Sequence, residues 1–133
     1  MKSLIVDDNP INLKVMIKYM QLYGQCVPAM NGQEAIEKFK HALNVNIPFD
    51  VVLLDIMMPE VDGHAALNGI RNLEKQFKIP AENKVKIIMT TALSDFKTVQ
   101  ASFAAMADGY LVKPIEKSKL IAEINKLCGT NLV

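Results

Sequence analysis

Four short apolar runs, each followed by charged or hydroxyl residues, constrain the fold of this chain most strongly. They occupy residues 4–6, 51–54, 85–89 and 110–112, and segments with helical periodicity separate them. This alternation is typical of strand–helix–strand units repeated around a parallel sheet. A weaker run at 25–28 contains a proline, which cannot donate a hydrogen bond within a sheet, so we expect an edge strand there. The sequence therefore predicts an α/β fold with five strands and five helices.

Length and charge narrow the classes of function. The chain has 133 residues, half of them apolar, which suits one domain spanning 1–133 with no output domain. A net charge of +1 with dispersed lysines gives no electrostatic footprint for nucleic acid or an anionic membrane. No apolar stretch approaches the roughly 20 residues that cross a bilayer, and no signal peptide is recognisable. We therefore expect a cytoplasmic protein with neither nucleic acid nor membrane as a partner.

Three acids follow two of the predicted strands. Asp7 and Asp8 come directly after residues 4–6, and Asp55 follows residues 51–54. The carboxyl ends of parallel strands form the ligand-binding edge of such sheets, so these acids should converge there. The alternative is that one of these acids only caps the following helix, but Asn9 can supply that cap. Adjacent carboxylates repel unless a cation lies among them, and an all-oxygen set suits Mg²⁺.

Asp55 is the predicted nucleophile of this site. Asp50 and Asp55 bracket the same strand and should lie about 16 Å apart, at opposite ends of the sheet. Only Asp55 can therefore join the acid cluster. A carboxylate can take a phosphoryl group to form an aspartyl phosphate, with Mg²⁺ and cationic donors offsetting the negative charge.

A lysine and a hydroxyl complete the predicted site. Lys113 precedes Pro114, which restricts the lysine to an extended conformation and directs the chain toward the last helix. Its ammonium can neutralise a phosphoryl oxygen. Thr91 follows the strand at 85–89, and its hydroxyl can donate to the same group. Each signal is weak alone, and the prediction depends on their joint order and spacing.

The sequence around these residues resembles response-regulator receiver domains of two-component signalling. The similarity lies in residues 4–9 (LIVDDN), 51–59 with Asp62 and Gly63 (VVLLDIMMP, then DG), 87–92 (IIMTTA) and 110–114 (YLVKP), and it covers essentially the whole chain. It implies a flavodoxin-like, doubly wound parallel sheet with strand order 2-1-3-4-5. It also implies that Asp55 is the phosphoacceptor, phosphorylated from a phosphohistidine.

The resemblance also implies which atoms bind magnesium. By this reasoning Asp8, Asp55 and the backbone carbonyl of Met57 ligate the ion, and Asp7 acts mainly through a bound water. Lys113 contacts the phosphoryl group.

A switch is implied as well. Thr91 and Ala92 fall on positions that contact the phosphoryl group, and Tyr110 matches the aromatic member of the switch pair. The peptide bond before Pro114 is typically cis in this family. Phosphorylation is expected to reshape the surface formed by the fourth helix, fifth strand and fifth helix, where an unknown output partner binds.

The expected phosphodonor is a sensor histidine kinase or a histidine-phosphotransfer protein. We favour a stand-alone, single-domain regulator, which catalyses only its own phosphorylation and dephosphorylation and is otherwise not an enzyme. Residues 7–12 and 31–35 also resemble receivers attached to hybrid histidine kinases, so a receiver taken from such a kinase is the alternative.

Three rivals use a similar fold or similar acids. A metal-dependent phosphohydrolase needs a substrate-enclosing cap and commonly a second acid two residues after the nucleophile, where this chain has Met57. A flavin-binding protein needs a phosphate loop after the first strand, where this chain has Asp7 and Asp8. The third rival is a receiver that binds partners without phosphate, against which the complete set of site residues argues.

Overall fold

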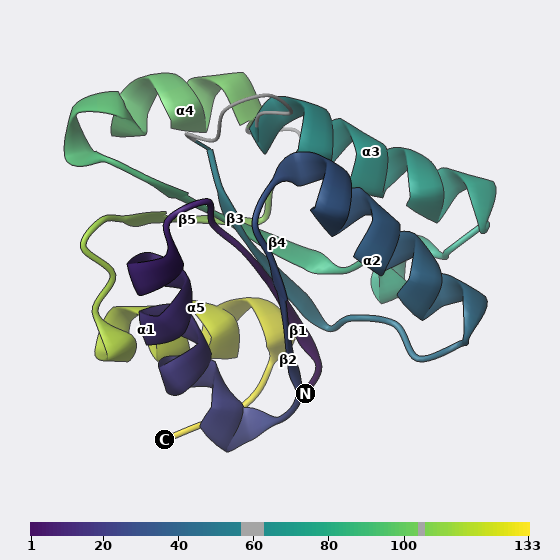
Figure 1. Ribbon diagram of the computed structural model, residues 1–133, viewed down its shortest axis with the longest axis horizontal. Coiled ribbons are helices and arrows are strands. Elements are labelled where there is room, and N and C mark those ends of the chain that lie inside the picture. Colours follow the sequence, from purple (N-terminus) through teal and green to yellow (C-terminus); the bar gives the residue numbers. More distant parts are fainter. Residues whose placement is uncertain (57–62, 104–105) are drawn as a thin grey trace.

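Five parallel strands form one sheet in the computed structural model, which describes residues 1–56, 63–103 and 106–133 (Figure 1). The strand order is β2-β1-β3-β4-β5. The predicted flavodoxin-like fold is therefore confirmed, including the order that the resemblance implied. The strands are β1 (Ser3–Val6), β2 (Cys26–Ala29), β3 (Val51–Asp55), β4 (Lys86–Thr91) and β5 (Gly109–Val112).

Helices cover both faces of the sheet. α1 and α5 lie on one face, and α2, α3 and α4 lie on the other (Figure 1). None of the helices in the described ranges is long and apolar enough to cross a membrane. The α-helices are α1 (Pro10–Met20), α2 (Gly32–Asn44), α3 (Gly63–Gln76), α4 (Phe96–Phe103) and α5 (Lys117–Cys128). Short 3₁₀ turns occur at η1 (Gln21–Tyr23), η2 (Ala81–Asn83) and η3 (Leu93–Asp95).

The central strands are apolar because both of their faces are buried. Alternate residues of β1 enter different cores: Leu4 and Val6 pack with α2 and α3, whereas Ile5 packs with α1 and α5. β2 is an edge strand, as the sequence predicted, and its Pro28 is exposed. The strands that carry the acids are thus fixed between two apolar layers.

Polar side chains fix where the first two helices begin. The Asn9 side chain accepts hydrogen bonds from the backbone N–H groups of Ile11 and Asn12 at the start of α1. Asn31 accepts one from the N–H of Glu34 over 2.8 Å at the start of α2. These caps satisfy N–H groups that have no partner within the helix, and the one at Asn9 sets the direction in which α1 leaves the acid site.

A charged network lies at the opposite end of the sheet from the acids, where β4 and β5 begin. The guanidinium of Arg71 on α3 contacts Glu74 over 2.7 Å and Asp108 over 2.9 Å. Glu74 is 2% exposed and also accepts a hydrogen bond from the backbone N–H of Val85 over 2.8 Å. This network joins α3 to the segments that enter β4 and β5.

Candidate functional site

Three carboxylates converge where β1 and β3 end. The two strands are neighbours, and Val6 pairs with Leu54, so Asp7 and Asp55 follow paired residues at the same edge. Oxygen atoms of Asp7, Asp8 and Asp55 all lie within 4.8 Å of one another. The structure therefore brings together the three acids that the sequence placed at this edge.

Two of these acids are removed from solvent. Asp55 is 2% exposed and Asp7 is 4% exposed, whereas Asp8 is half-buried. Burial raises the pKa of Asp7, and the neighbouring charge of Asp55 raises it further, although a 2.9 Å hydrogen bond from the N–H of Asn9 and the nearby Lys113 act in the opposite direction. Ionising Asp7 is therefore costly unless a cation compensates for its charge.

Lys113 supplies positive charge from the loop between β5 and α5. Its Nζ lies 3.0 Å from Oδ1 of Asp55 and 3.5 Å from Oδ2 of Asp7. Burial alone would lower the pKa of Lys113, but the hydrogen bond and charge of Asp55, together with the charge of Asp7, raise it overall. Lys113 is therefore a protonated ammonium, directed at the carboxylate predicted to be the nucleophile. The peptide bond between Lys113 and Pro114 is cis.

Thr91 lies at the same edge of the sheet as the acids. It is the last residue of β4 and is fully buried, and the residue before it, Thr90, pairs with Asp55. The Thr91 hydroxyl donates to the carbonyl of Ala92 over 3.5 Å, which is longer than an O–H···O hydrogen bond of ordinary strength. Such a weakly held hydroxyl is available to a stronger acceptor. Ala92 is exposed beside it.

Tyr110 lies on β5, further from the acids. Its ring meets Phe96 of α4 edge-on, with 6.4 Å between the ring centroids, and both residues line a cavity of about 210 Å³. The Tyr110 hydroxyl is buried and has no hydrogen-bond partner in the part of the chain that the structure describes. Burial and the nearby charge of Asp108 raise the pKa of Tyr110. A buried, unpaired hydroxyl costs free energy, so this side chain gains by moving to a partner.

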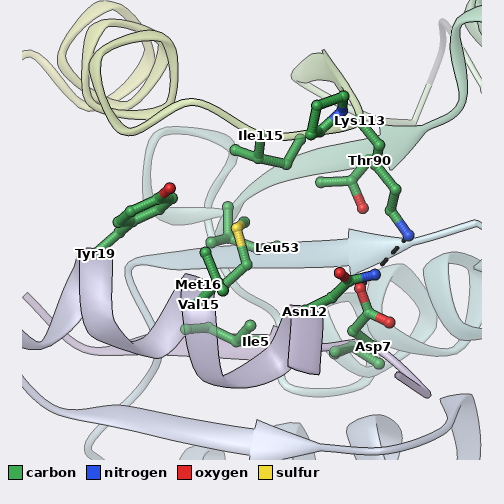
Figure 2. A pocket seen from close by; sticks show the side chains of 12 residues that line it. Ile5, Asp7, Asn12, Val15, Met16, Tyr19, Leu53, Thr90, Lys113 and Ile115 are labelled. Atoms are coloured by element: carbon green, nitrogen blue, oxygen red, sulfur yellow. Dashed lines mark hydrogen bonds and ion pairs between the residues drawn. The ribbon is translucent and has the colours of Figure 1, made fainter. Parts of the chain in front are cut away.

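A larger cavity, of about 440 Å³, lies beside the acids, between α1 and the loop that leads into α5 (Figure 2). One end is polar and includes Asp7, Asn12 and Lys113, and the rest is largely apolar. Sequence reasoning did not single out Asn12, which lies in the first turn of α1. The lining residues are Ile5, Val6, Asp7, Asn12, Val15, Met16, Tyr19, Leu53, Thr90, Lys113, Pro114 and Ile115.

The chemistry of the donor set fits a hard divalent cation. Oxygen atoms of three carboxylates lie close together, and Mg²⁺ prefers oxygen ligands while retaining several waters. Burial, and to a lesser degree the charge of Asp55, raises the pKa of Asp7, and a cation bound among the acids would offset both effects. The backbone carbonyl of Met57, the remaining predicted ligand, lies outside the described residues.

The fold, together with three acids and Lys113 at the carboxyl end of the sheet, is that of a receiver domain. A family model for the response regulator receiver domain matches residues 3–125. The chain belongs to this family, whose members act in two-component signal transduction and phosphorelays. At the level of the family, receiver domains are phosphoacceptors that bind Mg²⁺ in the active site and typically are not catalytic enzymes.

Similar proteins agree with this assignment. The chain is 38% identical over 132 residues to hybrid signal transduction histidine kinase L of Dictyostelium discoideum, covering 98% of this chain but only 7% of that kinase. Its structure resembles the receiver domain of Ssk1 of Saccharomyces cerevisiae, crystallised with the histidine phosphotransfer protein Ypd1. That comparison gives a TM-score of 0.81 at 25% identity and covers 97% of this chain and 89% of the other.

A third relative was crystallised with the metal. It is the receiver domain of the sensor histidine kinase PA1611 from Pseudomonas aeruginosa, with a magnesium ion coordinated in the active-site cleft. The TM-score is 0.76 at 25% identity, over 97% of this chain and 98% of that one.

Proposed function

We propose that Asp55 accepts a phosphoryl group from a phosphohistidine in a Mg²⁺-dependent reaction. The observation that carries this proposal is the pairing of a 2% exposed carboxylate at a strand end with an ammonium 3.0 Å away, inside a three-acid cluster. A buried carboxylate held beside a cation and a metal-binding set is arranged for phosphoryl transfer more than for structural support.

Each residue near Asp55 has a distinct role in this proposal. Asp8 and Asp55, with the carbonyl of Met57, would hold a magnesium ion, and Asp7 would act mainly through a bound water. When bound, the ion offsets negative charge on the transferring phosphoryl group. Lys113 leaves its ion pair with Asp55 and neutralises a phosphoryl oxygen.

The transfer exchanges one bond for another. A carboxylate oxygen of Asp55 forms a bond to phosphorus while the nitrogen–phosphorus bond of the donor breaks, and the electron pair stays on the donor imidazole. Thr91 then donates its hydroxyl to the new phosphoryl group, and the phosphoryl group also contacts the segment at Ala92. Thr91 is suited to this because its hydroxyl makes only a long contact in the unphosphorylated protein.

The output of the reaction is a changed protein surface. Phosphorylation adds nearly two negative charges and shifts an existing equilibrium between two conformations. Movement of Thr91 makes room for Tyr110, whose buried hydroxyl lacks a partner among the described residues. The surface formed by α4, β5 and α5 changes with it and binds the output partner.

The phosphodonor in this proposal is a sensor histidine kinase or a histidine-phosphotransfer protein. The complex of the Ssk1 receiver with Ypd1 and the similarity to a hybrid histidine kinase both support such a donor. This chain spans 7% of the length of that kinase, which makes the receiver of a hybrid kinase a specific second candidate. A stand-alone regulator made of residues 1–133 remains a prediction.

Intact mass spectrometry tests the phosphoacceptor. The purified chain is incubated with Mg²⁺ and acetyl phosphate, and beryllofluoride binding is followed in parallel. We expect one phosphoryl adduct in the wild type and in Asp50→Ala, and no adduct in Asp55→Ala. Asp50 is the matched control because it is an exposed aspartate just before β3, at the other end of the strand from Asp55.

Other outcomes would favour the rival functions. If neither the adduct nor beryllofluoride binding appears in the wild type, the acids are structural and the domain binds partners without phosphate. Multiple turnover of small phosphate esters would instead support the phosphohydrolase.

A further inference from the structure

Asn12 presents a carboxamide to the polar end of the 440 Å³ cavity. It lies in the first turns of α1, and its side chain is directed toward the end of the cavity where Lys113 and Asp7 form their ion pair (Figure 2). The residue is half-buried. It therefore reaches the reaction site from α1, whereas the acids and the lysine come from the sheet edge and the last loop.

The fold gives this carboxamide no task of its own. The helix cap is already supplied by Asn9, whose side chain accepts the backbone N–H of Asn12. The side-chain amide of Asn12 makes no hydrogen bond within the described parts of the chain. The amide is half-buried and is not shut off from solvent, so it is open to a ligand that enters the cavity.

The chemistry of the proposed donor identifies that ligand. Lys113 contacts Asp55 over 3.0 Å and also lines the polar end of the cavity with Asp7, so a donor group that delivers phosphate to Asp55 has room at this end. When the phosphorylated ring of the donor is protonated, its second nitrogen carries that proton, and an amide oxygen accepts such an N–H. The cavity volume falls within the range of about 300–1,000 Å³ that is usual for small-molecule sites.

We propose that Asn12 recognises the leaving imidazole of the phosphodonor through its carboxamide. This inference rests on the proposed phosphotransfer to Asp55. Oδ1 of Asn12 accepts the N–H of the donor ring and aligns the nitrogen–phosphorus bond with the Asp55 oxygen. As this bond breaks, its electron pair remains on the ring nitrogen. The proton on the other nitrogen stays in place, so the imidazole departs neutral.

Two small phosphodonors distinguish recognition of the imidazole ring by Asn12 from an effect of Asn12 on phosphorylation by any donor. N-phosphoimidazole carries the same ring as phosphohistidine, whereas acetyl phosphate releases acetate, which has no N–H for the amide to contact. Asn12→Leu should lower the phosphorylation rate constant about tenfold with N-phosphoimidazole, as expected for one lost hydrogen bond in the transition state. The rate constant with acetyl phosphate should change less than twofold.

Further variants control for shape and folding. Asn12→Gln keeps the carboxamide and should recover part of the rate with N-phosphoimidazole, while Asn12→Ser provides a smaller substitution that avoids an added apolar group. Asn44→Leu makes the same change at an exposed asparagine on α2 and should leave both rate constants unaltered. Beryllofluoride binding in each variant reports whether the acid site is intact.

The two donors make every outcome decisive. A loss confined to N-phosphoimidazole in the Asn12 variants supports recognition of the imidazole. An equal loss with both donors, or no loss with either, overturns it. If the wild type accepts phosphate from neither donor, the proposed function itself fails, and this result is distinct from any effect of Asn12.

Discussion

The Nζ of Lys113 lies 3.0 Å from Oδ1 of Asp55, so the ammonium neutralises the predicted phosphoacceptor in the unphosphorylated protein. The same ammonium is 3.5 Å from Asp7, and both carboxylates are nearly inaccessible to solvent. Lys113 therefore acts before any reaction, because it compensates for the repulsion between two buried acids.

Replacing Lys113 with methionine should destabilise the metal-free protein. The change leaves two buried carboxylates without their cation, so we expect a loss of about 2–3 kcal/mol in the free energy of unfolding. Added Mg²⁺ should recover more of this free energy in the variant than in the wild type. Urea unfolding with EDTA or Mg²⁺ measures both effects. Lys119→Met is the control, since its exposed pair with Glu116 should contribute less than about 0.5 kcal/mol. Equal losses in the two variants would contradict this account.

The stability of the metal-free protein should depend on the ionisation of Asp7. Burial raises the folded-state pKa of Asp7 above its ordinary value of 3.8, so the folded protein binds this proton more tightly than the unfolded chain does. The contribution of Asp7 to stability is therefore greatest below pH 3.8 and is lost as the pH rises through the raised pKa.

Asp7→Asn tests this dependence. In EDTA the variant should be more stable than the wild type near pH 7, and its advantage should shrink as the pH falls toward 3.8. The difference between the two unfolding curves isolates Asp7 from the other acids, and Asp50→Asn serves as an exposed control. If the difference in stability between Asp7→Asn and the wild type is the same at every pH in this range, burial does not govern the pKa of Asp7.

Loss of the Arg71 guanidinium should be strongly destabilising although it lies far from the acids. Arg71→Met leaves the 2% exposed carboxylate of Glu74 unpaired, and we expect a loss of about 3 kcal/mol. Adding Glu74→Gln should recover part of this loss, because the buried charge is then removed. Lys119→Met, which breaks an exposed 3.7 Å pair with Glu116, should cost less than about 0.5 kcal/mol. Chemical denaturation of the wild type, Arg71→Met, the double variant and the lysine control measures these losses. If the double variant is no more stable than Arg71→Met, the unpaired charge of Glu74 is not the cause of the loss.

Tyr110→Phe should leave the unphosphorylated protein as stable as the wild type or up to about 1 kcal/mol more stable. The substitution removes a buried hydroxyl that has no partner among the described residues. Tyr23→Phe gives the opposite sign, a loss of about 0.5–1 kcal/mol, because the Tyr23 hydroxyl donates to the carbonyl of Val133 over 2.6 Å. Thermal unfolding compares the two. A clear loss of stability in Tyr110→Phe would mean that its hydroxyl is already satisfied.

The local structure was largely predictable from the sequence. Apolar runs of strand length located every strand, and the residue after β1 and the last residue of β3 are the predicted acids Asp7 and Asp55. The Asn9 cap was equally clear, because a side chain that bonds its own helix depends only on its neighbours in sequence. Asn31 likewise caps α2 through the backbone N–H of Glu34, whereas the Glu34 carboxylate pairs with Lys38 over 3.0 Å.

The sequence by itself thus determined the strands, the helices and the edge at which the acids gather, since periodicity and turn chemistry are local properties. Only the tertiary structure decided that Lys113 pairs with Asp55, that Arg71 joins Glu74 to Asp108, and that Asn12 lines the cavity beside the acids. These contacts depend on how strands align and how helices pack on the sheet. That geometry is set by the burial of many side chains at once, and no single motif encodes it.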